Sequence, residues 1–313
     1  RSVSSAASDV YKRQDLCTIF SKLNKIFINN KTKQTIVFDE NGKFENLYDL
    51  TDSSVSKMFY NCDDIWIRDY LPKIYISDGS KKMIRYRFNA YGEKYNYKND
   101  NNFKEMLNYI SDEIVLDNFV LEGGNLEFSA RGILITNMHC IKKNNITGCT
   151  IDIEKEINRM TKKLGVSELF TINLNGIIGD DTNGHIDNFI RFIDNETIVY
   201  FASKDESYCN YQLACKLEKQ VKDIVDRSKI IKQAIPLYHS KDDELIKNGK
   251  IFPYSKLNFI ATTEFFIFPC ISNNRESLQH DLDSLPLKTK IYVINTEAAL
   301  TEYGGLHLSL IHI

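Results

Sequence analysis

The chain has 313 residues, 42% of them hydrophobic, and its 40 basic and 42 acidic residues nearly cancel to a net charge of −2. A chain of this length can bury one large core, but this charge gives no positive field that would attract nucleic acid or anionic lipid. The composition therefore excludes a polybasic nucleic-acid-binding or membrane-surface protein. It favours a protein that acts on a small molecule.

The cysteines are odd in number, irregularly spaced and without a C-x-x-C pair, at positions 17, 62, 140, 149, 209, 215 and 270. This pattern fits neither a disulfide framework nor a zinc-binding motif, and it favours reduced thiols. The sequence has no apolar run near the roughly 18 residues that span a bilayer and no signal-peptide core. We therefore expect a soluble protein of the cytoplasm, with no membrane contact.

The two ends differ in character from the rest of the chain. Residues 1–14 read RSVSSAASDVYKRQ, without apolar periodicity or an initiator Met, and residues 308–313 read LSLIHI. Both resemble translated sequencing adapter, although a disordered tail or transit-like peptide is the alternative for the first segment. We expect a single domain over 15–307, truncated at both ends, with non-native segments at 1–14 and 308–313.

Between the ends, strand-like and helix-like stretches alternate without a low-complexity linker. Branched and aromatic residues predict strands at 132–136, 197–202, 256–268 and 290–294. Apolar residues at helical spacing predict helices over 151–164 and 209–225. This alternation predicts an α/β or α+β fold, and no internal repeat is evident in the sequence.

The first segment rich in chemistry is DDIWIRDYLP, residues 63–72, which holds the only tryptophan of the chain. The face of Trp66 and the carboxylate of Asp69 can hold a planar cation by cation–π attraction and paired hydrogen bonds. The alternative is a buried Trp66 beside an internal salt bridge between Arg68 and Asp69.

A second segment, LEGGNL at 121–126, follows an apolar run. Glu122 is predicted to lie at a strand end, where the two glycines let the backbone turn or approach a ligand closely. A solvated glutamate at a Gly-Gly turn is the alternative.

The segment GDDTNGHIDNF, residues 179–189, carries the strongest signal for chemistry. If it is extended, His185 and Asp187 point to the same side, and they provide a proton-transfer group beside a carboxylate. With Asp180, Asp181 and Glu122, the same residues also have the ligand types of a metal hydrolase. A structural loop is the third interpretation, and the segment alone leaves all three open.

Together with FNAYGEKY (88–95) and EYGGLH (302–307), these segments resemble, in order and approximate spacing, the agmatine deiminase and bacterial peptidylarginine deiminase family of the guanidine-modifying superfamily. The sequences of residues 88–95 and 180–188 are closer to those of the agmatine deiminases. The resemblance implies a pentein-like five-bladed propeller of pseudo-symmetric ββαβ units, with the site at its axis.

The resemblance also implies a role for each matching residue. Asp69 and Asp187 would grip a guanidinium, Trp66 would line the pocket, His185 would be the acid/base, and Glu122 would be a further active-site acid. A cysteine thiolate attacks the guanidinium carbon, and water then releases the ureido product, without metal or organic cofactor.

The nucleophilic cysteine is expected directly after His307, but this chain has Leu308 there. Neither Ser309, an unactivated hydroxyl, nor Cys270, which is expected to be a core thiol, replaces it. Leu71-Pro72 also replaces the usual Gly-Pro, and residues 15–60 contain no early Trp-Pro segment.

The sequence thus predicts a hydrolase that converts agmatine to N-carbamoylputrescine and ammonia, a step of putrescine synthesis. The chain as written would bind a guanidinium and turn nothing over. The alternatives are a peptidyl- or free-arginine deiminase, a non-catalytic guanidinium-binding protein, and a metal-dependent hydrolase. Nucleic acid is not an expected partner, and a homo-oligomer is left open.

Overall fold

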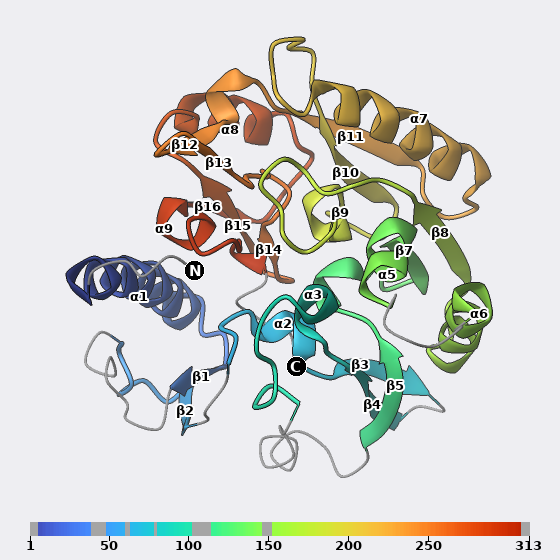
Figure 1. Ribbon diagram of the computed structural model, residues 1–313, viewed down its shortest axis with the longest axis horizontal. Coiled ribbons are helices and arrows are strands. Elements are labelled where there is room, and N and C mark those ends of the chain that lie inside the picture. The colour runs from blue at the N-terminus through green and yellow to red at the C-terminus, as the bar shows by residue number, and fades with distance from the viewer. Residues whose placement is uncertain are drawn as a thin grey trace.

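The computed structural model describes residues 6–38, 48–59, 63–77, 80–101, 114–145 and 152–307. These residues form a mixed α/β fold whose small sheets follow one another around the molecule, with the longer helices toward its outside (Figure 1). The α/β class is therefore confirmed.

Four sheets have three strands each and share one topology. They consist of β3 (Lys73–Ser77), β4 (Ser80–Arg87) and β5 (Ile114–Val120); β6 (Glu127–Phe128), β7 (Ile133–Asn137) and β8 (Glu168–Ile172); β9 (Ile190–Phe192), β10 (Thr197–Ala202) and β11 (Gln233–Tyr238); and β14 (Ile260–Ala261), β15 (Phe265–Cys270) and β16 (Lys290–Asn295). In each sheet the first strand is antiparallel to the second, and the second is parallel to the third.

A parallel neighbour requires a long crossover, and helices supply it. The crossover helices are α5 (Met138–Asn144) and α6 (Ile153–Lys163) in the second sheet, α7 (Tyr211–Arg227) in the third and α8 (Arg275–Asp283) in the fourth. A parallel pair, β1 (Gln34–Phe38) and β2 (Val55–Phe59), and a hairpin, β12 (Leu245–Lys247) and β13 (Lys250–Phe252), complete the strands. The ββαβ order thus recurs, although no repeat is evident in the sequence.

Most of the predicted elements are confirmed. The strands at 132–136, 197–202 and 290–294 correspond to β7, β10 and β16, and the helices at 151–164 and 209–225 correspond to α6 and α7. The single strand predicted over 256–268 is wrong. Its second half is a hairpin of β14 and β15, because the Thr262 hydroxyl accepts the backbone N–H groups of Glu264 and Phe265 and turns the chain there.

The middle strands β7, β10 and β15 are buried along their whole length and carry the main core. Cys270, at the end of β15, is a buried free thiol, as predicted. No helix in the described ranges is long and apolar enough to cross a membrane.

Helix α1 (Ala6–Asn29) packs beside the last sheet (Figure 1). Its apolar residues Leu16, Ile19, Leu23 and Phe27 join a cluster that includes Phe265. The helix continues through residue 14 without a break, so no end of an element marks the predicted boundary there. The non-native origin of 1–14 stays a prediction, and residues 308–313 lie outside the described residues.

Candidate active site

The structure brings the predicted acid/base and carboxylates to one place. His185 Nδ1 lies 3.8 Å from Asp69 Oδ1, and His185 Nε2 lies 4.0 Å from Glu122 Oε2. Asp69 lies in α2 (Ile67–Tyr70), Glu122 is the second residue after β5, and His185 and Asp187 lie at η3 (Ile186–Asn188). All four side chains are at most 2% exposed. Segments up to about 120 residues apart therefore form one buried site.

Asp69 is fixed by two donors from other motifs. The N–H of Gly124 donates to Oδ1 at 2.7 Å, and the Tyr91 hydroxyl donates to Oδ2 at 3.0 Å. The neighbouring Gly123 has no room for a side chain, since an added Cβ would lie 2.1 Å from the carbonyl oxygen of Arg68. The Gly-Gly turn therefore exists because two backbone segments meet there.

Glu122 is not a solvated turn residue. Its Oε1 accepts a hydrogen bond of 2.9 Å from Asn144 Nδ2, and the residue is 1% exposed. It is the residue immediately before the short helix η2 (Gly123–Asn125) and faces His185. Glu122 therefore lies buried just past a strand end, and its role in the site stays a prediction.

Arg68 and Trp66 both contact the C-terminal motif. Arg68 Nε donates to the carbonyl oxygen of His307, which is not the internal salt bridge considered for this segment. The ring of Trp66 packs on Gly304 so closely that an added Cβ would lie 2.1 Å from Trp66 Cε2. Trp66 is 5% exposed, and this contact explains why the motif has a glycine there.

Residues 185–187 are not extended, which was the condition for His185 and Asp187 to point to the same side. The chain makes a 3-10 turn, because the N–H of Asn188 donates to the carbonyl oxygen of His185. Gly184 enters this turn with φ +94°, a conformation that favours glycine. Asp187 Oδ2 therefore faces a different partner, His307 Nδ1, at 2.8 Å.

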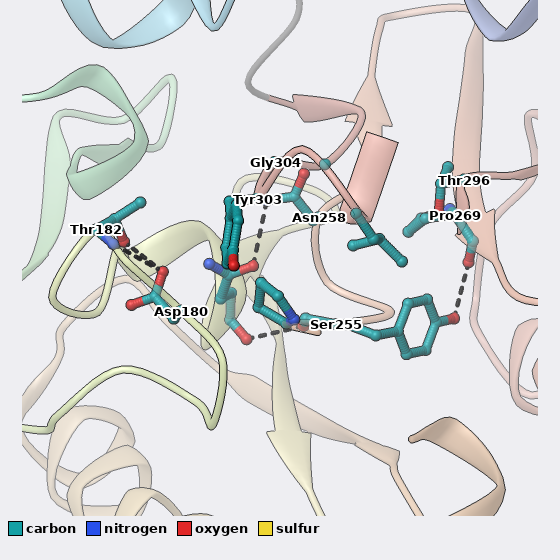
Figure 2. A pocket seen from close by; sticks show the side chains of 13 residues that line it. Asp180, Thr182, Ser255, Asn258, Pro269, Thr296, Tyr303 and Gly304 are labelled. Carbon is teal, nitrogen blue, oxygen red and sulfur yellow. Dashed lines mark hydrogen bonds between the residues drawn. The ribbon is translucent and has the colours of Figure 1, made fainter. Parts of the chain in front are cut away.

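Of the carboxylates considered for a metal hydrolase, Asp180 and Asp181 bind groups of their own loop or of Tyr95 rather than His185. Asp180 caps its own loop. Its Oδ1 accepts from the Thr182 hydroxyl (Figure 2), and its Oδ2 accepts from the Gly184 N–H. Asp181 Oδ2 accepts from Tyr95 at 2.6 Å. Both side chains are used to hold the loop, so the predicted ligand set of His185, Asp187 and Asp180 or Asp181 is not assembled.

Burial and mutual charge shift the pKa values of the site. Burial raises the pKa of Asp187 to about 7 and also raises the pKa of Glu122. Burial alone would lower the pKa of His185, but the carboxylates of Asp69 and Glu122 outweigh it and raise this pKa. The buried cations Arg68 and Lys73 also interact with the acids of this site, Arg68 with Asp187 and Lys73 with Glu122.

Tyr91 was not predicted as a site residue. It lies in α3 (Ala90–Glu93), a turn in which all four residues have positive φ, between 48° and 89°. A left-handed turn is strained for residues other than glycine. It places the Tyr91 hydroxyl 3.1 Å from Asp64 and 3.0 Å from Asp69. Such strain is typical of functional sites. The motif FNAYGEKY, which contains Tyr91, could have indicated it as a site residue.

His307 and Asn258 were also missed. Asn258 Oδ1 accepts the backbone N–H of His307 at 2.9 Å, and His307 is 3% exposed. The motif EYGGLH could have indicated His307 as a site residue. No motif indicated Asn258, because it lies between β13 and β14 in the stretch expected to be one strand.

A small pocket adjoins this side of the site (Figure 2). Its volume is about 10 Å³, room for about one water molecule. It is lined by Asp180, Thr182, Asn258, Tyr303 and Gly304 among others. Through Asn258 it approaches the backbone of His307.

Several known proteins are similar to this chain. A putative agmatine deiminase of Vibrio parahaemolyticus is 24% identical over 290 residues, covering 84% of this chain and 79% of that protein. An agmatine deiminase of Pseudomonas aeruginosa is 27% identical over 217 residues, and this match covers 64% of this chain and 58% of that protein.

Solved structures share the fold. A C. jejuni agmatine deiminase with substrate bound has a TM-score of 0.82 at 23% identity, covering 95% of this chain and 86% of that one. An agmatine deiminase of Enterococcus faecalis has a TM-score of 0.81 at 19% identity, covering 93% and 85%. The model of the Porphyromonas-type peptidyl-arginine deiminases matches residues 8–310. The resemblance seen in the sequence is confirmed: the chain belongs to the Porphyromonas-type peptidyl-arginine deiminase family.

Proposed function

We propose that this protein is a guanidinium deiminase whose substrate is agmatine. The observation that carries the proposal is the convergence of three buried carboxylates, Asp69, Glu122 and Asp187, around His185. A guanidinium is planar and permanently charged, and two carboxylates can grip it by paired hydrogen bonds. The named activity of the relatives supports the same substrate class.

The proposed reaction needs a cysteine at position 308. Its thiolate sulfur bonds to the guanidinium carbon, the C–N bond breaks, and ammonia leaves with a proton from His185. Water then gives one proton to His185 as its oxygen bonds to the carbon. The C–S bond breaks to return the thiolate, and the remaining hydroxyl proton passes to the released ammonia, which leaves neutral N-carbamoylputrescine. Leu308 cannot take this role, so the chain with leucine binds the substrate without turnover.

Peptidylarginine or free arginine is the second candidate substrate, since the matching family model is named for peptidyl-arginine deiminases. The complete burial of His185 and Asp187 favours a small free guanidine over an arginine that is part of a folded protein.

The finer architecture is also a proposal. The four ββαβ sheets would be four blades of a pentein-like propeller, and the parallel pair β1 and β2 would belong to the fifth. The buried site would then lie at the axis. Cytoplasmic location belongs to the same set of proposals.

Binding can be tested on the chain with Leu308 by isothermal titration calorimetry. We expect agmatine to bind and putrescine, which lacks the guanidinium, to bind far more weakly. Asp187→Asn should abolish agmatine binding, whereas the matched exposed change Asp223→Asn in α7 should leave it intact. Equal binding of agmatine and putrescine would contradict the proposal, and tighter binding of an arginine peptide would favour the second candidate.

A further inference from the structure

A buried thiol lies beside the acid/base histidine, outside the set of residues that the proposed reaction uses. Cys140, in α5, is 0% exposed, and its Sγ lies 3.9 Å from Glu122 Oε2. The potential ligand atoms of Glu122, Cys140 and His185 all lie within 4.8 Å of one another. Within the described part of the chain, both ring nitrogens of His185 lack a hydrogen-bond partner.

We propose that Glu122, Cys140 and His185 bind a thiophilic divalent cation such as Zn²⁺. A carboxylate, a thiolate and an imidazole are ligand types that Zn²⁺ uses in proteins. The site would be inhibitory, because the ion takes the acid/base histidine and one of the active-site acids.

The geometry is close to what a tetrahedral ion needs. With bond lengths of about 2.0–2.3 Å, the ligand atoms of such an ion lie about 3.3–3.6 Å apart. The pairs Cys140 Sγ–Glu122 Oε2 and His185 Nε2–Glu122 Oε2 lie 3.9 Å and 4.0 Å apart. Small side-chain rotations close this difference, and a water molecule takes the fourth position.

The surroundings hold the ligands in place and provide charge. Asn144 Nδ2 donates to Glu122 Oε1 at 2.9 Å and lies 3.5 Å from Cys140 Sγ. Asp69 and Asp187 add negative charge around His185, so a cation is stabilised there. On binding, the Cys140 thiol releases its proton to solvent as the metal–sulfur bond forms.

Thr182 adjoins both this cluster and the pocket of Figure 2. It lines the pocket, and its carbonyl oxygen accepts from Cys140 Sγ at 3.4 Å.

Cobalt(II) is the probe for the test, because a thiolate–Co²⁺ bond gives a near-ultraviolet charge-transfer band. Titration of the protein with Co²⁺ should produce this band, and Zn²⁺ should remove it by displacement. Cys140→Ser should lose the band, whereas the matched control Cys270→Ser, another buried thiol, should keep it. Circular dichroism checks the fold of each variant. Should Cys140→Ser not fold, His185→Gln replaces it and should weaken Co²⁺ binding by more than about tenfold.

Absence of the band from the unaltered chain, or its persistence in Cys140→Ser, would overturn the proposal. The titration uses the chain with Leu308 and requires no turnover, so failure of the deiminase proposal would leave this result standing. Where the deiminase proposal also holds, agmatine added first should lower the apparent affinity for Co²⁺.

Discussion

His307 Nδ1 and Asp187 Oδ2 lie 2.8 Å apart, although 120 residues separate them in the chain. The backbone of His307 is held on both sides, because Arg68 Nε donates to its carbonyl oxygen and Asn258 accepts its N–H. His307 is therefore bound to the carboxylate that we propose holds the guanidinium.

The binding of agmatine should depend on the ionisation of Asp187. Burial raises the pKa of Asp187 to about 7, so the carboxylate takes up a proton and loses its charge as the pH falls below that value. The affinity should then drop by up to about tenfold per pH unit. Calorimetry measures the affinity for agmatine between pH 6 and 9, which extends about one unit or more on each side of this pKa. Affinity independent of pH in this range would contradict the assignment.

Asp100 should make the fold less stable at higher pH. Its side chain accepts the backbone N–H groups of Asp63 and Asp64, and burial raises its pKa to about 7. A carboxyl whose folded pKa lies above the unfolded value of about 3.9 stabilises the fold at low pH, and this contribution is lost as the pH rises through the folded pKa.

The variant Asp100→Asn stays neutral and keeps an acceptor oxygen. We expect it to raise the free energy of unfolding by about 1–3 kcal/mol at about pH 8 and by less near pH 5, since the difference grows as the pH rises from the unfolded to the folded pKa. Urea unfolding at the two pH values measures this, with the exposed change Asp223→Asn as control. A variant that is less stable than the parent at pH 8 would show that the charged form is favoured.

The left-handed turn α3 offers a stabilising change at an exposed position. Glu93 has φ 67° and an exposed side chain. Glu93→Gly removes strain of about 1–2 kcal/mol at an entropic cost of about 0.5–1 kcal/mol. We therefore expect Glu93→Gly to raise the free energy of unfolding by about 0.5 kcal/mol. The same substitution in a right-handed helix, Glu154→Gly in α6, should instead destabilise by about 0.5–1 kcal/mol. Equal signs for both variants would contradict the strained geometry.

Gly304→Ala should disturb the contact with Trp66. The added Cβ would lie 2.1 Å from the ring, and such overpacking costs about 1–3 kcal/mol. Agmatine affinity should fall as well, because Trp66 and His307 are displaced. Gly165→Ala is the control: its Cβ would meet nothing within 4 Å, although its φ of +66° adds strain. Thermal melting and calorimetry separate the two effects, and unchanged binding in Gly304→Ala would remove Trp66 from the site.

The sequence predicted the residues of the site better than their geometry. Asp69, Glu122, His185 and Asp187 could be predicted because each lies in a dense motif, and they converge. The 3-10 turn after His185 could not be predicted, because a short alternation of apolar and polar residues is as compatible with a strand as with a turn.

Two other features lay beyond the sequence. Cys140 lies in no motif, and only the packing of α5 brings its thiol to Glu122. The fourfold ββαβ order was also hidden, because hydrogen-bond topology repeats here without a repeat of residues.

The most direct test of the proposed function is the activity of Leu308→Cys. This change supplies the thiolate that the proposed reaction needs and leaves the other site residues as they are. Incubation with agmatine should release ammonia and N-carbamoylputrescine in equal amounts, and the parent chain and Leu308→Ser should release neither. A folded Leu308→Cys variant that binds agmatine without forming these products would contradict the account.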